Sequence, residues 1–233
     1  MTSPRPRRTP KPLHVLDARR GLTPRARAYL AAYGVRREVW SPEQHRRHWH
    51  RYHRPAAAIE HLAAYQGRWG GLELPPTPEY EGGPHVLDAD EPTVEEGRGA
   101  CFTAGRPRFT SACGFMVDGD GRFGIVADDT WVPLHGSIEG WVESLALRHF
   151  ADSLPAEMAL ATGARLDGLA ERLRLRPLAE VAGAAGAADG WWRGEDTLLA
   201  VYRGEARLFD NVQYQTAYLY TGIDGLTERL RAG

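Results

Sequence analysis

The stretch "CGFMVDGDGRFGIVADDTWVPLHGSIEGWVESLAL", residues 113–147, contains the strongest folding signals in the chain. Two β-rich runs are joined by "DGDG", a composition typical of a hairpin turn, and a third β-rich run follows at 130–134. Ser137 then stands where a helix needs an N-cap, and apolar residues recur behind it at helical spacing. The stretch therefore predicts an antiparallel meander with a helix over 138–150 packed on it.

The acids of the same stretch raise the alternative of a calcium loop. Asp118 and Asp120 have the spacing of its first and third ligands, but Arg122 and Phe123 follow where an oxygen donor and a glycine are needed. A guanidinium inside the site would repel the ion. We therefore interpret "DGDG" as a hairpin turn and expect no metal or other cofactor.

Helical patterns precede this stretch, and a mixed pattern follows it. Thr23–Pro24 and Ser41–Pro42 predict two helix starts, and an apolar segment from Ala56 predicts a third helix that ends at Gly67. Residues 75–99, rich in Pro, Gly and acids, predict a long loop. Helical residues are expected at 164–181, strands at 197–203, 205–211 and 214–222, and a last helix at the C-terminus.

These elements predict an α+β fold. We expect an antiparallel β-meander with N-terminal helices and a closing helix packed on it, plus a smaller C-terminal α+β unit. The predicted units are a disordered basic tail at 1–12, the main domain at 13–152 and the smaller unit at 164–233. "HGSIEGWVESLAL" resembles "YTGIDGLTERL". Either an internal duplication or a shared strand-to-helix solution explains that likeness.

Charge is distributed unevenly along the chain. Residues 1–54 carry 14 basic residues against three acids, a net charge of +11, whereas residues 55–164 carry six arginines against 17 acids, a net charge of −11. Two interpretations follow: the acids meet a basic partner, or they hold the basic N-terminal segment of the same chain.

Most enzyme signatures are missing from the sequence. It has no G-x-S-x-G, H-E-x-x-H, G-x-G-x-x-G or paired CxxC motif, and Lys11 is the only lysine, as in many proteins of GC-rich genomes. Cys101 and Cys113 predict small buried residues. No apolar run is long enough to span a membrane, and no signal core is present, so we expect a cytoplasmic protein with no membrane partner.

The histidines of "SPEQHRRHWHRYHRP" are the best catalytic candidates. A helix turns His45 and His48 to one side and His50 and His53 to another, so the four cannot share one metal ion. The alternative is an enzyme site assembled between this 45–53 helix and the acidic hairpin. We favour a structural helix with His45, Trp49 and Tyr52 turned inward.

The same segment also has the composition of a nucleic-acid-binding helix, because arginines alternate with aromatic residues. The helical wheel nevertheless places Arg47, Arg51 and Arg54 opposite the aromatic face. A surface on which bases stack would present both kinds of residue together, so the sequence disfavours nucleic acid as a partner.

Three segments together suggest a family. "YQGRWGG" at 65–71, the acidic hairpin "FMVDGDGRFGIVADD" and the helix start "SIEGWVE" resemble the SUKH superfamily of bacterial immunity proteins over roughly residues 56–150. The resemblance implies an α+β domain that binds and neutralises a toxin, often a nuclease or deaminase, through a variable surface. It leaves the N-terminal basic helix and residues 165–233 unaccounted for.

The expected function is therefore a cytoplasmic protein-binding module, an immunity protein for a basic toxin. Acids around an aromatic residue suit the capture of a basic protein surface. We expect the hairpin acids to lie near one another and to form this binding face with the aromatic residue that follows them: Asp118, Asp120, Asp128, Asp129 and Trp131. The sequence leaves the oligomeric state open.

Overall fold

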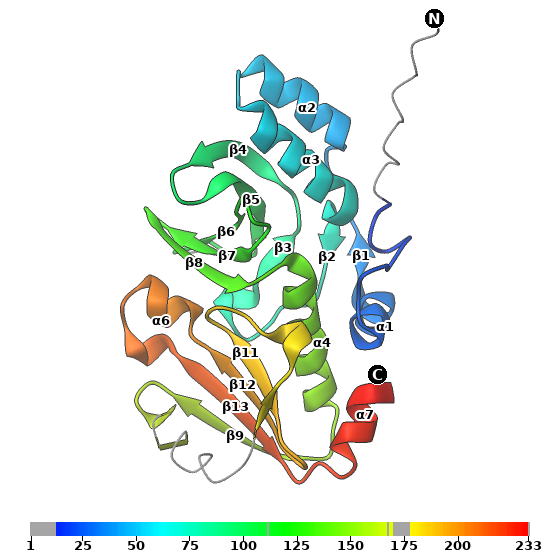
Figure 1. The fold of residues 1–233 in the computed structure, drawn as a ribbon, viewed down its shortest axis with the longest axis vertical. Coiled ribbons are helices and arrows are strands. Elements are labelled where there is room, and N and C mark those ends of the chain that lie inside the picture. The colour runs from blue at the N-terminus through cyan, green and yellow to red at the C-terminus, as the bar shows by residue number, and fades with distance from the viewer. Residues whose placement is uncertain (1–12, 111, 167, 170–177, 233) are drawn as a thin grey trace, which may run out of the picture.

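The chain adopts the predicted α+β fold, with an antiparallel strand meander covered by helices (Figure 1). The computed structural model describes residues 13–110, 112–166, 168–169 and 178–232. The predicted tail at 1–12 lies outside these residues, and so does most of the helix expected at 164–181. In Figure 1 the helices α2 and α3 lie at one end of the molecule and a second sheet lies at the other.

The N-terminal helices begin where their capping residues predict. Thr23 caps α1 (Pro24–Tyr33), and Ser41 forms a capping box with Gln44 at the start of α2 (Pro42–Arg51). The third helix, α3 (Ala56–Trp69), passes through Gly67 and ends at Gly70 instead. A single glycine inside a helix costs only about 1 kcal/mol, and the buried side chains of Tyr65, Gln66 and Trp69 hold the last turn against the core.

The first sheet has the strand order β1-β2-β3-β5-β6-β7-β8, and β4 also pairs with β5. Its strands are β1 (Val35–Arg36), β2 (Leu72–Glu73), β3 (Pro84–Val86), β4 (Asp90–Glu95), β5 (Gly99–Pro107), β6 (Gly114–Val117), β7 (Phe123–Ala127) and β8 (Thr130–His135). The meander from β5 to β8 is the one predicted from the sequence. All its pairs are antiparallel.

The expectation of a long loop at 75–99 was wrong. This segment contains a short 3₁₀ helix, η1 (Tyr80–Gly82), and the strands β3 and β4. Both strands pair with the long strand β5, β4 along its first half and β3 along its last residues. Pairing with β5 holds them in place, so their own sequences lack the alternation of a half-buried strand.

The second sheet has the order β10-β11-β12-β13-β9. Its strands are β9 (Glu157–Thr162), β10 (Ala179–Glu180), β11 (Gly190–Arg193), β12 (Leu198–Tyr202) and β13 (Thr216–Thr221). Every residue of β12 is buried, because this central strand packs against apolar side chains on both faces of the sheet. The predictions for β12 and β13 were right, whereas β9 and β11 were not predicted. The strand β10 lies at the end of the segment 164–181 that was expected to be helical, so that expectation was wrong for these two residues.

The strand expected at 205–211 was also wrong. Residues 204–208 form a short helix, α6 (Gly204–Leu208), followed by the 3₁₀ helix η3 (Val212–Tyr214). Glu, Ala, Arg and Leu all favour a helix when no neighbouring strand is available for pairing. The last helix is α7 (Leu226–Ala232), as predicted.

The helix α4 (Ile138–Asp152) joins the two sheets. Trp141 packs on Phe123 of the meander, with ring centroids 5.0 Å apart. On the other side, the Trp191 indole N–H donates to the Ser144 hydroxyl at 2.9 Å, and the Tyr220 hydroxyl donates to Asp152 at 2.6 Å. One hydrophobic cluster accordingly runs from the N-terminal helices through α4 into the second sheet.

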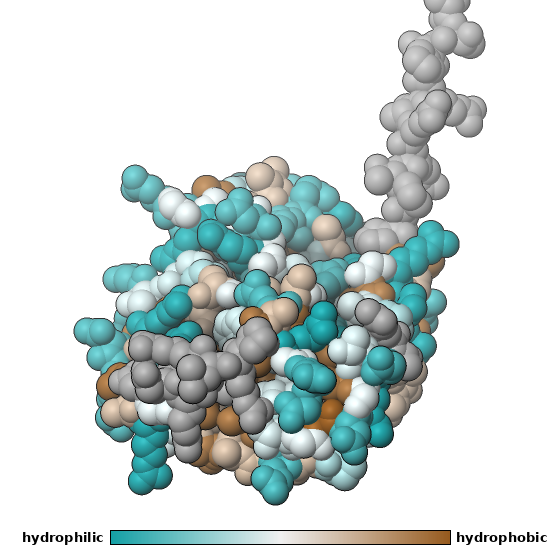
Figure 2. Space-filling view, turned by 60° about the horizontal axis from the view of Figure 1, so that its bottom comes forward, coloured by the Kyte–Doolittle hydropathy of each residue, from teal (hydrophilic) through white to brown (hydrophobic). Residues whose placement is uncertain are grey.

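Two features bear on the class of protein. Cys101 and Cys113 are buried, and they form no disulfide bond with each other. No helix among the described residues combines the length and apolar character needed to cross a membrane. On the end of the molecule formed by the second sheet, apolar side chains occur in small patches separated by hydrophilic ones (Figure 2).

Trp141 gives a direct test of the packing of α4. The residue is 6% exposed, so Trp141→Ala should lower the free energy of unfolding by about 3–5 kcal/mol, because it removes a large side chain from the core. Phe109→Ala is the matched control: its ring is 70% exposed, and its removal should change stability by less than about 0.5 kcal/mol. Urea unfolding of both variants measures the difference, and equal midpoints would show that α4 is misplaced.

Candidate functional site

The predicted hairpin acids do not all face solvent. Asp118 is fully buried, and its carboxylate accepts hydrogen bonds from the backbone N–H groups of Asp120 and Arg122 and from the Arg122 guanidinium at 2.7 Å. The residue organises the β6–β7 turn and is not available to a partner.

The expectation that the four acids lie near one another was wrong. Asp120 belongs to the turn before β7, whereas Asp128 and Asp129 form the turn after it, so the strand β7 separates them. Five strand residues at about 3.3 Å each keep the two turns more than 15 Å apart. Trp131 is half-buried on β8 and its ring lies against Gly124, where an added Cβ would come within 2.7 Å of the ring. The sheet thus holds Trp131 beside β7, not at the centre of an acidic cluster.

The histidines of α2 are likewise dispersed. His45 is 3% exposed, and burial lowers its pKa, which keeps the ring neutral. His48 is half-buried, and His50 and His53 are exposed. Among the described residues, no three His, Cys, Asp or Glu side chains lie close enough to hold a metal ion. Tyr52, expected to point inward, is 61% exposed because it lies just past the last helical residue.

Some of the acids do hold the basic N-terminal segment. Arg25 binds the buried Glu143, Arg37 binds Glu73, and Arg46 binds Glu60 at 2.8 Å. These pairs tie α1, β1 and α2 to the rest of the chain. They leave other acids without an ion pair within the described part of the structure, and two of these, Glu81 and Glu205, line the same pocket.

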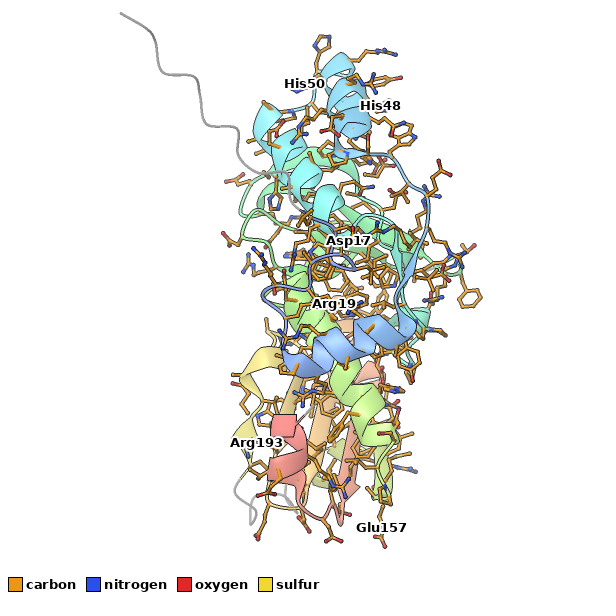
Figure 3. The ribbon with its side chains drawn as sticks, turned by 90° about the vertical axis from the view of Figure 1, so that its right-hand side faces the viewer. Asp17, Arg19, His48, His50, Glu157 and Arg193 are labelled. Atoms are coloured by element: carbon orange, nitrogen blue, oxygen red, sulfur yellow. The ribbon has the colours of Figure 1, made fainter. Side chains whose placement is uncertain are left out.

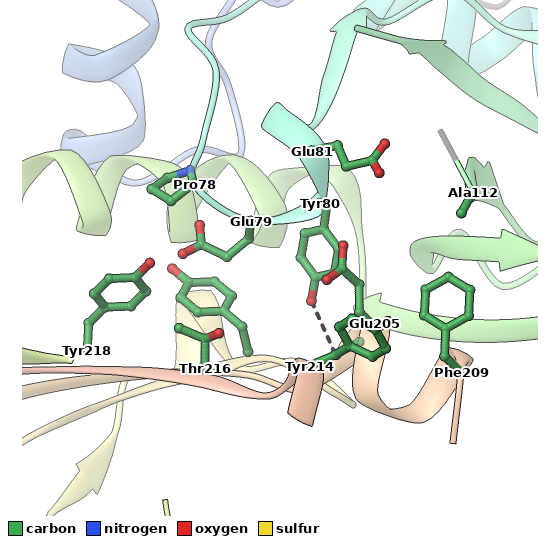
Figure 4. Close-up of a pocket in the computed structure, with 12 residues that line it drawn as sticks. Pro78, Glu79, Tyr80, Glu81, Ala112, Glu205, Phe209, Tyr214, Thr216 and Tyr218 are labelled. Carbon is green, nitrogen blue, oxygen red and sulfur yellow. Dashed lines mark hydrogen bonds between the residues drawn. The ribbon is translucent and has the colours of Figure 1, made fainter. Parts of the chain in front are cut away.

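This pocket, with a volume of about 460 Å³, lies between the first sheet and the second (Figure 4). The segment around η1 forms one wall, and β13, α6 and η3 form the other. The described lining residues carry three carboxylates and several aromatic rings but no positive charge: Pro78, Glu79, Tyr80, Glu81, Ala112, Tyr202, Gly204, Glu205, Phe209, Tyr214, Thr216 and Tyr218.

The wall formed by the segment around η1 has an unusual backbone conformation. Tyr80, Glu81, Gly82 and Gly83 all have positive φ values, of 53°, 50°, 92° and 72°. For the two non-glycine residues such a conformation costs of the order of 1–3 kcal/mol each, and it persists only where surrounding contacts enforce it. The segment thereby turns Glu81 toward the pocket while Tyr80 points into the protein (Figure 4).

The contacts that hold this segment come from the second sheet. The Tyr80 hydroxyl donates to the Asp189 carboxylate at 2.5 Å, and the Gly204 N–H donates to the Tyr80 hydroxyl at 3.2 Å. Asp189 also accepts from the Arg203 N–H at 3.0 Å. A Cβ at position 204 would lie 2.5 Å from the Tyr80 hydroxyl, so only glycine fits there. We call this group of Tyr80, Asp189 and Gly204 the latch.

The negative charge of the pocket carboxylates is not fully compensated by nearby cationic side chains. Burial raises the pKa of Glu79, although the Arg148 guanidinium lies 3.2 Å away and opposes the shift. Burial also raises the pKa of Glu205, and repulsion from Glu81 and then Glu79 raises it further. A cation that entered the pocket would relieve this repulsion.

A small cavity of about 20 Å³ lies behind the pocket, between the latch and α4. Its wall includes His135, which is 2% exposed and whose pKa burial lowers to about 4. The cavity has room for about one water molecule. Its size excludes a substrate, so His135 has no access to one from this side.

The arrangement is suited to binding a cation. Negative charge and the faces of tyrosine rings both attract ammonium and guanidinium groups. Sequence reasoning missed this pocket, because its residues come from 78–81, 112 and 202–218 and share no motif. The one local signal was the pair of glycines after "YE", which permits the left-handed turn.

The role of Asp118 can be tested with its neighbour as control. Asp118→Ala removes a buried acceptor of three hydrogen bonds and should lower the free energy of unfolding by about 1–3 kcal/mol. Asp120→Ala removes an exposed side chain and should change it by less than about 0.5 kcal/mol. The free energies are measured by urea unfolding. Equal effects would contradict the assignment of Asp118 to the turn.

The latch predicts a dependence of stability on pH. Burial raises the pKa of Asp189 to about 7 in the folded protein, whereas its pKa in the unfolded chain is near 3.9. Between these two pH values the folded protein therefore holds a proton on Asp189 that the unfolded chain has released. The stabilising contribution of this proton is complete below about pH 4 and is lost as the pH rises to about 7. In the Asp189→Asn variant, the free energy of unfolding should fall less between about pH 4 and about pH 7 than it does in the wild type. Wild type and variant curves that run parallel would contradict the prediction.

Comparison with known proteins adds no identification. No protein-family model, no curated protein and no solved structure matches the chain.

Proposed function

We propose that the protein is a protein-binding module whose inter-sheet pocket receives a basic side chain of its partner. The observation that carries the proposal is the combination of Glu81 and Glu205, which lack ion pairs within the described chain, with the aromatic rings of the same pocket. The partner is a protein with an exposed arginine or lysine.

Charge supports a cationic ligand. Glu205 is half-buried and is repelled by two other carboxylates, so its ionised form is destabilised in the free protein. An arginine or lysine side chain between Glu81 and Glu205 would form the charge pairs that the pocket lacks. Charge-assisted hydrogen bonds of this kind are among the stronger ones in proteins.

The aromatic residues support a long side chain with an apolar stem. Phe209 and Tyr214 are 40% and 50% exposed, and their ring centroids lie 5.6 Å apart at one side of the pocket. Such rings pack on the methylene groups of arginine or lysine and attract the charged head through their π faces. Arg148 already stacks on Tyr218 in this way, 3.8 Å from the ring centroid.

The biological form that we propose is an immunity protein that neutralises a basic toxin, such as a nuclease or deaminase. The resemblance of residues 56–150 to the SUKH superfamily and the acidic middle of the chain both favour it. An acidic surface also speeds encounter with a basic partner.

The pocket can be tested with a labelled hexa-arginine peptide, and binding is measured by fluorescence anisotropy. The double variant Glu81→Gln, Glu205→Gln should weaken binding at least tenfold, because each carboxylate contributes a charge-assisted hydrogen bond of about 1.5–3 kcal/mol. Tyr214→Ala should also weaken it, since the ring is removed.

The matched control is the double variant Glu91→Gln, Glu96→Gln. It removes the same charge from exposed positions on and beside β4, outside the pocket. Its affinity for the peptide should fall less than threefold. If the two double variants weaken binding equally, only the net charge attracts the peptide, and the proposed pocket function is wrong.

A further inference from the structure

We propose a second binding surface, for single-stranded nucleic acid, on the α2 end of the molecule. It consists of three aromatic rings, Trp40, His48 and Tyr52, together with the exposed arginines of the same segment, Arg47, Arg51 and Arg54, and we call it the α2 platform. Figure 3 shows His48 and His50 at the end of the molecule opposite Glu157 and Arg193 of the second sheet. The proposal does not depend on the pocket.

The three rings form a continuous row. The His48 ring lies between the other two, with its centroid 4.9 Å from that of Trp40 and 4.8 Å from that of Tyr52. The two outer rings are open to solvent, Trp40 at 46% and Tyr52 at 61% exposure. Contiguous exposed apolar surface is uncommon on a soluble protein and is a feature of interaction sites.

A buried layer keeps the row in place. Trp49 is 9% exposed and contacts the His48 ring with a centroid distance of 4.7 Å. His45 is 3% exposed and lies 5.4 Å from the Trp40 ring, centroid to centroid. The exposed rings therefore rest on packed residues, so binding would not need to order them first.

The surroundings of the row are positively charged. Arg47, Arg51 and Arg54 are exposed, and none of them has an ion pair with any described residue. The Arg54 guanidinium lies 5.8 Å from the centroid of the Trp49 ring, on the aromatic side of the helix. The helical wheel disfavoured nucleic acid because it placed rings and arginines on opposite faces. Tyr52 is exposed and Arg54 lies on the aromatic side, so the objection does not hold for this pair of residues.

The chemistry favours a polynucleotide over other anionic ligands. Exposed rings bind bases by stacking without regard to sequence, and neighbouring arginines contact the phosphates. An acidic protein would pair with the arginines but would leave the rings without a matching partner. The chain's own residues 1–12 carry Arg5, Arg7, Arg8 and Lys11 and no acid or aromatic residue, so their charge does not complement the platform. Single-stranded nucleic acid satisfies both features.

The experiment uses the full chain with fluorescent 12-mers of dT and of U, a 12-base-pair duplex and labelled hexaglutamate, all followed by anisotropy. The single strands should bind more tightly than the duplex or the peptide, and the ratio of the dT and U affinities shows whether DNA or RNA is preferred. Trp40→Ala with Tyr52→Ala should weaken binding of the single strands at least fivefold, because the variant removes base–aromatic stacking.

Two further variants separate stacking from charge. Arg51→Gln with Arg54→Gln should reduce the slope of log affinity against log salt by about 0.7 for each phosphate that is no longer neutralised, whereas exposed Arg27→Gln on α1 should leave the slope unchanged. Tyr214→Ala, an aromatic residue 50% exposed in the pocket, should bind the oligonucleotides as wild type does.

Three results would overturn the proposal: no binding of the single strands at low salt, equal binding of hexaglutamate, or unchanged oligonucleotide affinity after removal of both rings. Circular dichroism of the Trp40→Ala, Tyr52→Ala variant checks that α2 remains folded. Hexa-arginine binding by the same variant should match wild type, so failure of the α2 platform and failure of the pocket are distinguishable.

Discussion

Arg148 is the partly buried cation on which the junction of the two sheets depends. It projects from α4, pairs with Glu79 at 3.2 Å and Asp152 at 2.8 Å, and stacks on Tyr218 of the second sheet. A charge that is largely withdrawn from water is destabilising when it loses a partner, so these contacts support one another. One side chain thus fixes the segment before η1 against the second sheet, and the pocket forms where the two meet.

The latch completes this junction and explains the strained backbone beside it. Tyr80 reaches Asp189, more than a hundred residues away in the chain, and both depend on the absence of a side chain at Gly204. These contacts hold two consecutive non-glycine residues in a left-handed conformation. The strain places Glu79 and Glu81 on the pocket wall, where their repulsion of Glu205 prepares the pocket for a cation.

The charged residues that are distributed unevenly along the chain fall into three groups in the structure. One group is internal, because arginines of α1, β1 and α2 pair with Glu143, Glu73 and Glu60. The remaining acids include those of the pocket, and the remaining arginines include those of the α2 platform. The two proposed binding surfaces thus carry opposite charge and lie on separate elements of the chain.

The sequence by itself determined the elements whose signals are local. The caps Thr23, Ser41 and Ser137, the "DGDG" turn and the helical spacing of Trp141 and Leu145 depend on neighbours a few residues away, and the structure confirms each of them. Only the tertiary structure decided the rest. Asp118 looked like an exposed acid, but the turn buries it, and Tyr52 looked like an inward residue, but the helix ends before it. The pocket and the latch could not be predicted from the sequence, because residues far apart in the chain form them. Contacts between such residues are set by tertiary packing and not by a local sequence pattern.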